Sequence, residues 1–291
     1  MIQVVFVKWG RKYDPRYIHG LLDAIRRHTA RDLRVVCITD DATGLSPDII
    51  TRPFPDLGMP LQDMTAFGGC LPKLSMFAPG VLDPDLKTIY LDIDTGIFGD
   101  IGELVDLLDT HPCLHALPNH FLPHWRTPWL SWMTPEGCFF INSSVMVFRP
   151  GQHADIFTDF LDAFHKAYRP EIARKAMPLP LRSDERFISQ HEKGKLRALP
   201  RSLAGSFKDL YMGPLDRILG TFPFLMKSRG RVALTFHGDA LKPDLMAGFE
   251  PGQEIRQGGF RTRWRHPEFA RYWADILAPD APDDPGHDPS K

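Results

Sequence analysis

The chain has few cysteines, no long hydrophobic run and no excess of either charge. Its four cysteines contain no C-x-x-C pair, which argues against a disulfide framework or a cysteine-based zinc site. The apolar opening, residues 1–7, is too short for a signal peptide's hydrophobic region or a membrane span. We expect no transmembrane segment, and a protein that is cytoplasmic or peripheral to the inner membrane.

The charge balance excludes a general attraction to polyanions. Lysine and arginine total 35 against 36 acidic residues, a formal net charge of -1, so nothing favours nucleic acid as a partner. The chain of 291 residues is 43% hydrophobic and 24% charged, which is typical of a globular protein. We expect one large domain with additions at its C-terminal end.

The first half of the sequence alternates between strand and helix patterns. The expected strands cover residues 4–7, 33–39 and 88–92, and helices are expected after Asp14-Pro15 and over residues 73–78. Such an alternation predicts an α/β fold, with a Rossmann-like sheet and helices on both of its faces.

An apolar strand runs directly into two acids, Asp92 and Asp94. Ligands of α/β sheets bind outside the carboxyl ends of strands. Alternate strand residues share a face, so both carboxylates can reach one cation if the strand geometry continues through Asp94. A divalent cation held by oxygen ligands commonly recruits substrate phosphates. The alternative is an ordinary acidic turn.

A later strand, residues 232–236, ends in His237 and Gly238, and Lys242 follows shortly after. Such an imidazole can add a nitrogen ligand to a carboxylate-bound Mn²⁺, and the lysine can neutralise a leaving pyrophosphate. A surface turn is the alternative, because glycine and proline are common in turns.

The segment 118–137 is rich in proline and contains Trp125, Trp129 and Trp132. Sugars stack on flat aromatic faces, so this loop is a candidate for acceptor recognition; alternatively, the tryptophans cover the core. Four histidines have spacings reminiscent of a metal site, but prolines interrupt them, and we interpret them as solvated loop residues. They are His111, His115, His120 and His124.

Four segments occur in an order that resembles family-8-type retaining glycosyltransferases of the GT-A fold. They are residues 90–94 (YLDID), 140–146 (FINSSVM), 183–188 (SDERFI) and 236–243 (FHGDALKP). Residues 7–13 and 38–41 are similar to a bacterial group within that set, which depends on nucleotide sugars. The resemblance covers about residues 1–250. It implies a GT-A-like domain over 1–250 with a mixed sheet. We expect residues 251–277 to be an extension packed on it, and 278–291 to be a disordered tail.

By this resemblance Asp92, Asp94 and His237 bind Mn²⁺ (or Mg²⁺), Lys73 contacts the donor sugar or diphosphate, and Lys242 holds the β-phosphate. The implied donor is a nucleotide-diphosphate sugar, with a UDP-sugar as the first candidate. The implied acceptor is a saccharide or a lipid-linked molecule.

Other candidates surround this centre. Asn142 is implied to contact the donor. Lys8, Trp9 and Asp40 follow the first two strands, where a base and ribose would lie. Trp9 could stack on the base or simply plug the end of its strand.

Asp184 and Glu185 fall where the resemblance implies the reacting face of the sugar, although the family usually has an amide at the second position. Glu185 could act as a nucleophile, stabilise a cation, or complement the positive end of its helix; we favour the helix-end role. Two other functions stay open, a haloacid-dehalogenase-like phosphatase and a non-catalytic sugar-nucleotide-binding protein.

Overall fold

The computed structural model describes residues 1–119, 141–169, 171–212, 231–257 and 260–278. Its central sheet has seven strands in the order β3-β2-β1-β4-β7-β6-β8. The strands are β1 (Ile2–Lys8), β2 (Leu33–Thr39), β3 (Ile50–Arg52), β4 (Thr88–Leu91), β6 (His115–Pro118), β7 (Ile141–Phe148) and β8 (Arg197–Ala198). Strands β3, β2, β1 and β4 are parallel, whereas β7 runs antiparallel to both β4 and β6. The predicted mixed sheet is confirmed.

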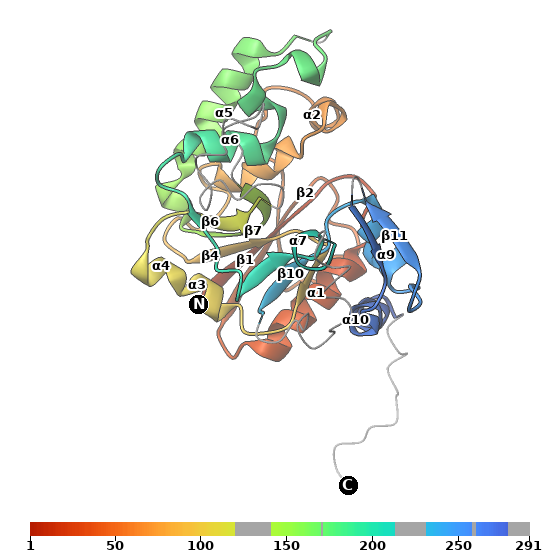
Figure 1. The fold of residues 1–291 in the computed structure, drawn as a ribbon. Helices are drawn as coiled ribbons and strands as arrows, with labels where there is room; N and C mark the ends of the chain where they lie inside the picture. Colours follow the sequence, from red (N-terminus) through yellow and green to blue (C-terminus); the bar gives the residue numbers. More distant parts are fainter. Residues whose placement is uncertain (120–140, 170, 213–230, 258–259, 279–291) are drawn as a thin grey trace.

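Alternation along β1 places apolar side chains on both faces of this sheet. Val4 and Phe6 belong to one hydrophobic core, and Val5 and Val7 to the other, because successive strand residues point to opposite sides. The first core contains residues of α1 (Pro15–His28), α3 (Gly102–Val105) and α4 (Leu107–Thr110). The second contains residues of α2 (Leu61–Phe67), the 3₁₀ helix η1 (Leu71–Phe77), α5 (Ala154–Ala167) and α6 (Asp184–His191). Helices therefore cover both faces (Figure 1).

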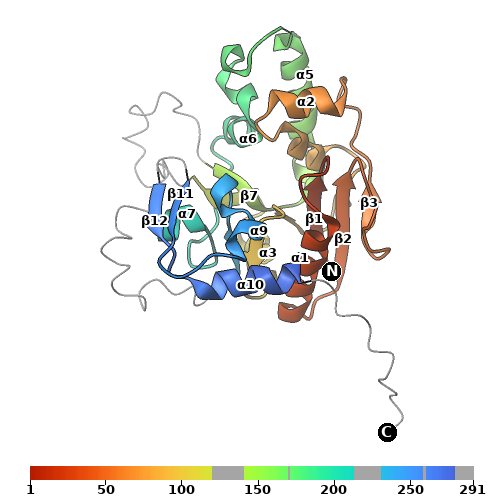
Figure 2. The ribbon, with the colours of Figure 1, turned by 90° about the vertical axis from the view of Figure 1, so that its right-hand side faces the viewer.

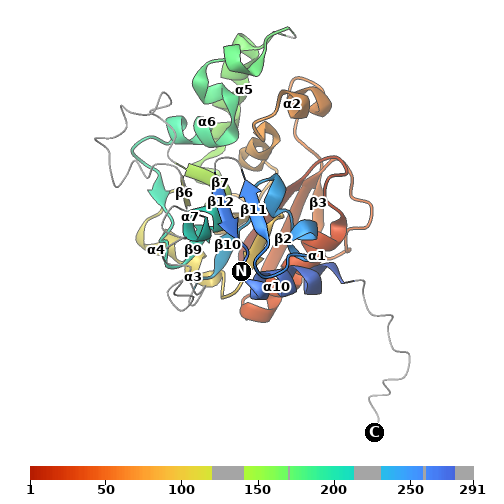
Figure 3. The same ribbon diagram turned by 45° about the vertical axis from the view of Figure 1, so that its right-hand side comes forward.

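A smaller sheet extends the fold, with the order β5-β10-β9. Its strands are β5 (Thr95–Ile97), β10 (Ala233–Thr235) and β9 (Ala204–Ser206). The hairpin of β11 (Glu254–Gln257) and β12 (Phe260–Arg263) lies beside this sheet and near α7 (Phe207–Tyr211) (Figures 2 and 3). The remaining helices are η3 (Pro150–Gln152), η4 (Arg174–Ala176), η5 (Leu179–Arg182), η7 (Asp239–Leu241), α9 (Pro243–Met246) and α10 (Pro267–Leu277).

The C-terminal segment contributes to a third hydrophobic core. Trp264 and Trp273 are completely buried, with ring centroids 5.6 Å from Phe207 and 5.7 Å from Phe236 respectively. Helix α10 packs against α1 (Figure 2). This segment therefore packs on the rest of the fold, while the boundary at residue 250 stays a prediction. The predicted tail lies almost wholly outside the described residues.

The short helix expected over 73–78 occurs as the 3₁₀ helix η1 (Leu71–Phe77). One local expectation was wrong. His115 is a buried strand residue, 2% exposed, rather than a solvated loop histidine. Its Nε2 lies 3.0 Å from the carbonyl oxygen of His111. Within the described residues, no helix is both long and apolar enough to cross a membrane.

Candidate active site

Most of the predicted site residues line one cavity of about 240 Å³ at the carboxyl ends of β1 and β4. Those residues are Lys8, Trp9, Lys73, Asp92, Asp94, His237 and Lys242. Segments far apart in the sequence meet here, because parallel strands place their carboxyl ends on one edge of the sheet. Asp40, Asn142, Asp184 and Glu185 do not line this cavity.

The two acids of the D-x-D motif point to different partners. Strand β4 ends at Leu91, and the backbone then turns, with the amide of Thr95 donating to the carbonyl of Asp92 at 3.0 Å. The strand geometry therefore does not continue through Asp94, and the alternation invoked from the sequence does not apply. The turn separates Asp92 and Asp94 into two ion pairs.

Asp92 is paired with Lys73 from η1. The lysine Nζ lies 2.6 Å from Oδ1 and 2.8 Å from Oδ2 of Asp92, and the hydroxyl of Tyr90 donates to the same carboxylate. Burial lowers the pKa of Lys73, but the surrounding acidic groups, Asp92 first among them, together outweigh burial and leave the pKa well above its ordinary value. Lys73 is thus a charged ammonium in a largely buried pair.

Asp94 is paired with Lys242, whose Nζ lies 2.6 Å from Oδ2. Lys242 also contacts the hydroxyl of Tyr13, which donates to Asp94 at 3.1 Å. Burial raises the pKa of Tyr13, and the charges of Asp94 and Asp92 raise it further. Tyr13 therefore stays a neutral hydrogen-bond donor. No local pattern distinguishes Tyr13 in the sequence, although it lies in the opening segment, residues 7–13, that carries part of the resemblance.

His237 reaches the cavity from the loop after β10. Its Nε2 lies 2.8 Å from Oγ of Ser206, and its Nδ1 lies 3.2 Å from Nζ of Lys208. Burial lowers the pKa of Lys208. The following Gly238 has φ +118, and a Cβ there would lie 2.6 Å from Cδ of Gln257, so the turn that presents His237 requires glycine.

Asp92, Asp94 and His237 are suitable ligands for a divalent metal, but their ligating atoms are not close enough together to form a metal site as they stand. Two carboxylates and an imidazole are appropriate ligands for Mn²⁺ or Mg²⁺. Among described residues, only Asp155, His191 and Glu192 have ligating atoms within 4.8 Å of one another. The ammonium groups of Lys73 and Lys242 currently neutralise Asp92 and Asp94. The side chains are therefore of the right chemical type to bind a metal. The ammonium groups of Lys73 and Lys242 would compete with that metal for the two carboxylates.

A second acidic pair lies beside this cavity at the start of α6. Oδ2 of Asp184 accepts a 2.6 Å hydrogen bond from the Ser143 hydroxyl. Oε1 of Glu185 accepts hydrogen bonds from Asn142 Nδ2 at 3.1 Å and from the Ser143 amide at 3.2 Å. Glu185 thus faces β7 as well as belonging to the first turn of its helix. Lys73 Nζ, 3.5 Å from Ser143 Oγ, connects this pair to the cavity.

Burial raises the pKa of both carboxyl groups, Asp184 to about 6 and Glu185 to about 8. Lys73 opposes the shift at Asp184, whereas the charge of Asp184 adds to the shift at Glu185. At neutral pH the pair therefore carries about one proton. With Glu185 largely protonated, Asp184 stays charged beside it without strong repulsion.

The residues expected to bind the nucleotide lie at the ends of β1 and β2. The amide of Gly10 donates to both carboxylate oxygens of Asp40, at 3.0 and 3.2 Å. Lys8 Nζ donates to the Gly10 carbonyl at 3.3 Å. Trp9 is half-buried, lines the cavity and packs against the second core. The tryptophans of residues 118–137 lie outside the described residues.

No known family profile and no curated protein matches the sequence. Solved structures do match its fold. The galactosyltransferase LgtC, in complex with donor and acceptor sugar analogues, is 15% identical with a TM-score of 0.56, and the match covers 96% of this chain and 98% of LgtC. The chain has the GT-A fold. The predicted fold class is thereby confirmed.

Two longer glycosyltransferases match in the same way. GlyE of Streptococcus pneumoniae is 15% identical with a TM-score of 0.55, and the match covers 95% of this chain. The bifunctional WbbM is 14% identical with a TM-score of 0.53, and the match covers 97% of this chain. The chain spans 63% of the length of GlyE and 50% of that of WbbM.

Proposed function

We propose that the chain is a glycosyltransferase that transfers a sugar from a nucleotide-diphosphate donor to a saccharide or lipid-linked acceptor, in a metal-dependent reaction with retention. The observation that carries this proposal is the cavity in which two carboxylate–lysine pairs and His237 meet at the strand ends of a GT-A fold. LgtC, which has that fold, was solved with donor and acceptor sugar analogues.

Asp92, Asp94 and His237 would hold Mn²⁺ (or Mg²⁺). When bound, the metal would neutralise the donor diphosphate and stabilise it as a leaving group. Burial strengthens metal binding by these carboxylates, because charge interactions are stronger away from water. Asp94 is only 4% exposed.

The two lysines offer a way to exchange partners. Lys73 and Lys242 neutralise the acids in the free protein. An arriving diphosphate and its cation would release both ammonium groups to phosphate oxygens, with Lys242 at the β-phosphate, and leave the carboxylates to the cation. Charge stays balanced throughout, so neither acid is left buried and unpaired.

Asp184, Glu185 and Asn142 would border the reacting face of the sugar. As the anomeric bond breaks, positive charge develops on the sugar, and a nearby carboxylate stabilises it. The hydrogen bonds from Ser143 to Asp184 and from Asn142 to Glu185 hold both carboxyl groups in fixed orientations.

Lys8, Trp9 and Asp40 would bind the nucleotide, with Trp9 offering an aromatic face to the base. A UDP-sugar is the first donor to test. The GT-A fold favours glycosyl transfer over the phosphatase alternative. Only an activity measurement distinguishes the proposed enzyme from a protein that binds sugar nucleotides without turning them over.

A donor screen tests this proposal. Nucleotide sugars are added to the full chain with Mn²⁺ or with a chelator, and unfolding is followed by thermal shift. A ligand that binds only the folded state raises the melting temperature. We expect a shift from one class of nucleotide sugar, in Mn²⁺ only. Stabilisation by phosphatase substrates, with none by any nucleotide sugar, would instead favour the phosphatase.

A further inference from the structure

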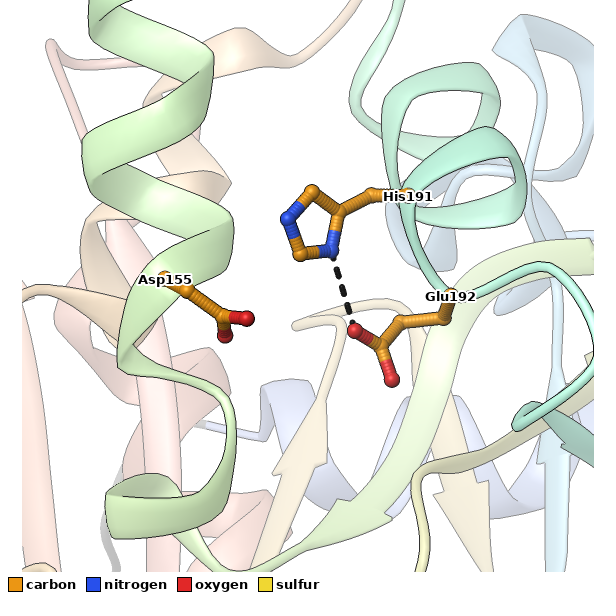
Figure 4. Close-up of side chains that lie close together, drawn as sticks. All are labelled: Asp155, His191 and Glu192. Carbon is orange, nitrogen blue, oxygen red and sulfur yellow. Dashed lines mark hydrogen bonds and ion pairs between the residues drawn. The ribbon is translucent and has the colours of Figure 1, made fainter.

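A second group of metal-ligand side chains lies where α5 meets the end of α6. Asp155 is in the first turn of α5, His191 is the last residue of α6, and Glu192 follows it. Ligating atoms of the three lie within 4.8 Å of one another, and Figure 4 shows the side chains converging on one space. None of them lines the candidate active-site cavity.

Glu192 is a buried carboxylate with incomplete hydrogen bonding. Its side chain is 2% exposed. Oε1 lies 3.0 Å from Nδ1 of His191, but Oε2 has no hydrogen-bond partner among the described residues. Buried carboxylates normally satisfy both oxygens with hydrogen bonds, whereas Oε2 has an ion-pair contact to Nδ1 of His153 at 3.3 Å, so it has room for one more ligand.

His153 approaches the same carboxylate from the start of α5. Its side chain is 6% exposed, and Nδ1 lies 3.3 Å from Oε2 of Glu192. The geometry gives no hydrogen bond, and neither ring nitrogen of His153 has such a partner in the described part of the chain. A buried imidazole is thus directed at the cluster, in ion-pair contact with Glu192 but without a hydrogen bond.

The cluster has more negative than positive charge. Asp159 adds a third carboxylate, 3.1 Å from Nε2 of His191. Within the described residues, no ion pair with lysine or arginine is found for Asp155, Asp159 or Glu192. Neighbouring carboxylates repel one another, and only protonation of the two imidazoles, His191 and His153, would offset that repulsion within the cluster. A divalent cation would offset more.

We infer that Asp155, His191 and Glu192 form a site for a divalent transition metal of the zinc class, separate from the candidate active site. Imidazole nitrogen and carboxylate oxygen are the donors that Zn²⁺ takes, often as three protein ligands and a water. Zinc ligand bonds of about 2 Å place tetrahedral ligand atoms roughly 3.3 Å apart. The ligating atoms of the three groups, within 4.8 Å of one another, would have to approach to that spacing when the metal binds.

The position of this site gives it a structural consequence. Helix α6 has Asp184 and Glu185 in its first turn and His191 at its end. A helix of this length spans about 12 Å. A metal that joins the end of α6 to α5 would fix the helix that presents the two acids. The inference about metal binding itself does not depend on the proposed function.

Zinc binding by the full chain tests the inference. The protein is stripped with a chelator, and Zn²⁺ is titrated by calorimetry and by thermal shift. Asp155→Asn and His191→Ala each remove one ligand. Asp162→Asn, on the exposed face of the same helix α5, is the matched control. We expect Zn²⁺ to stabilise the wild type and the control equally, and at least tenfold weaker binding by both ligand variants.

Two further variants locate the metal. Asp94→Ala changes the candidate active site, and Cys113→Ser changes a neighbouring cavity of about 430 Å³ that Glu192 and His153 also line. Both should keep the Zn²⁺ site that Asp155→Asn and His191→Ala weaken, although Asp94→Ala also removes a ligand of the metal proposed for the active site, which takes Zn²⁺ as well. Loss of the site between α5 and α6 in either variant would place that metal elsewhere and overturn the inference.

Two other results would also contradict it. No Zn²⁺ binding by the wild type would mean that contacts with His191 and His153 suffice to hold the acids together. Unchanged binding by Asp155→Asn would exclude Asp155 as a ligand. Because Asp155 is exposed, Asp155→Asn should fold even if His191→Ala does not. The absorption spectrum of bound Co²⁺ gives a second readout, which reports the coordination of the metal.

Discussion

The candidate active site and the α5–α6 cluster contain similar side chains but balance their charges differently. Each has two principal carboxylates and an imidazole: Asp92, Asp94 and His237 in the first, and Asp155, Glu192 and His191 in the second. In the first, each acid is paired with its own lysine. In the second, the imidazole of His191 contacts Glu192 and Asp159, and Asp155 lies nearby without a lysine or arginine partner among the described residues.

This difference indicates what each region is prepared to bind. Lysines beside the acids suit an anionic ligand that arrives with a cation, because both sets of charges then find new partners. Acids around an imidazole, with no lysine pairing in the described structure, suit a cation alone. The predictions below separate these two kinds of site.

The largest effect should come from the acids and imidazole of the cavity. Asp94→Ala and His237→Ala should each reduce metal-dependent turnover of the nucleotide sugar by about a thousandfold or more, since a metal ligand is worth several kcal/mol in the transition state. Nucleotide release is the assay. The matched control, Asp63→Ala, removes an exposed acid on α2 and should keep full activity.

His191→Ala should have a smaller effect on the same assay, about tenfold at most, because it acts only through the position of α6. If His191→Ala reduced turnover as much as Asp94→Ala does, the distinction between the two regions would fail.

An intermediate effect is expected when a lysine is removed. Lys73→Met leaves Asp92 without its buried partner, and breaking such a pair is destabilising. The melting temperature in chelator should fall by roughly 5 °C. Mn²⁺ should then raise it by more than in the wild type, because the competing ammonium is gone. Lys166→Met, which breaks an exposed pair on α5, should change it little.

An Mn²⁺ response that is no larger in Lys73→Met than in the wild type would argue against competition between lysine and metal.

The smallest predicted effect concerns the pH dependence of stability. The pKa of Glu185 is raised from an ordinary 4.5 to about 8, so between these values the folded state binds more protons than the unfolded state. Its contribution to stability therefore falls as the pH rises and is lost above pH 8. Glu185→Gln cannot ionise, so its melting temperature should exceed that of the wild type increasingly from pH 5 to pH 8.

The melting temperature of Glu185→Gln should exceed that of the wild type by a few degrees at pH 8. The neighbouring Asp184 titrates in both proteins, so it does not account for the difference. Curves of melting temperature against pH that run parallel for the two proteins would show that Glu185 is not held neutral.

The sequence was informative where structure is determined locally. The strand over residues 33–39 and the helix capped by Asp14 both occur as expected, since apolar periodicity and an N-cap are local signals. The mixed sheet was predicted from the resemblance instead. No single segment of the sequence indicates that β7 pairs antiparallel with β4.

The partners of the site residues could not be predicted. Asp92 and Asp94 looked like members of one strand, but the turn after Leu91 sends them to Lys73 and Lys242, which lie far away in the sequence. Tyr13, Ser206 and Lys208 have no distinguishing local pattern, and only the fold brings them to the acids and to His237. The histidine cluster around Glu192 was missed for the same reason.

The most direct test of the central claim is equilibrium binding of a nucleoside diphosphate, UDP first, to the wild type and to Asp94→Ala, in Mn²⁺ and in chelator. We predict binding by the wild type in Mn²⁺, and binding at least a hundredfold weaker when either the metal or the Asp94 carboxylate is removed. Equal affinity under all four conditions would contradict a metal-assisted diphosphate site at Asp92, Asp94 and His237.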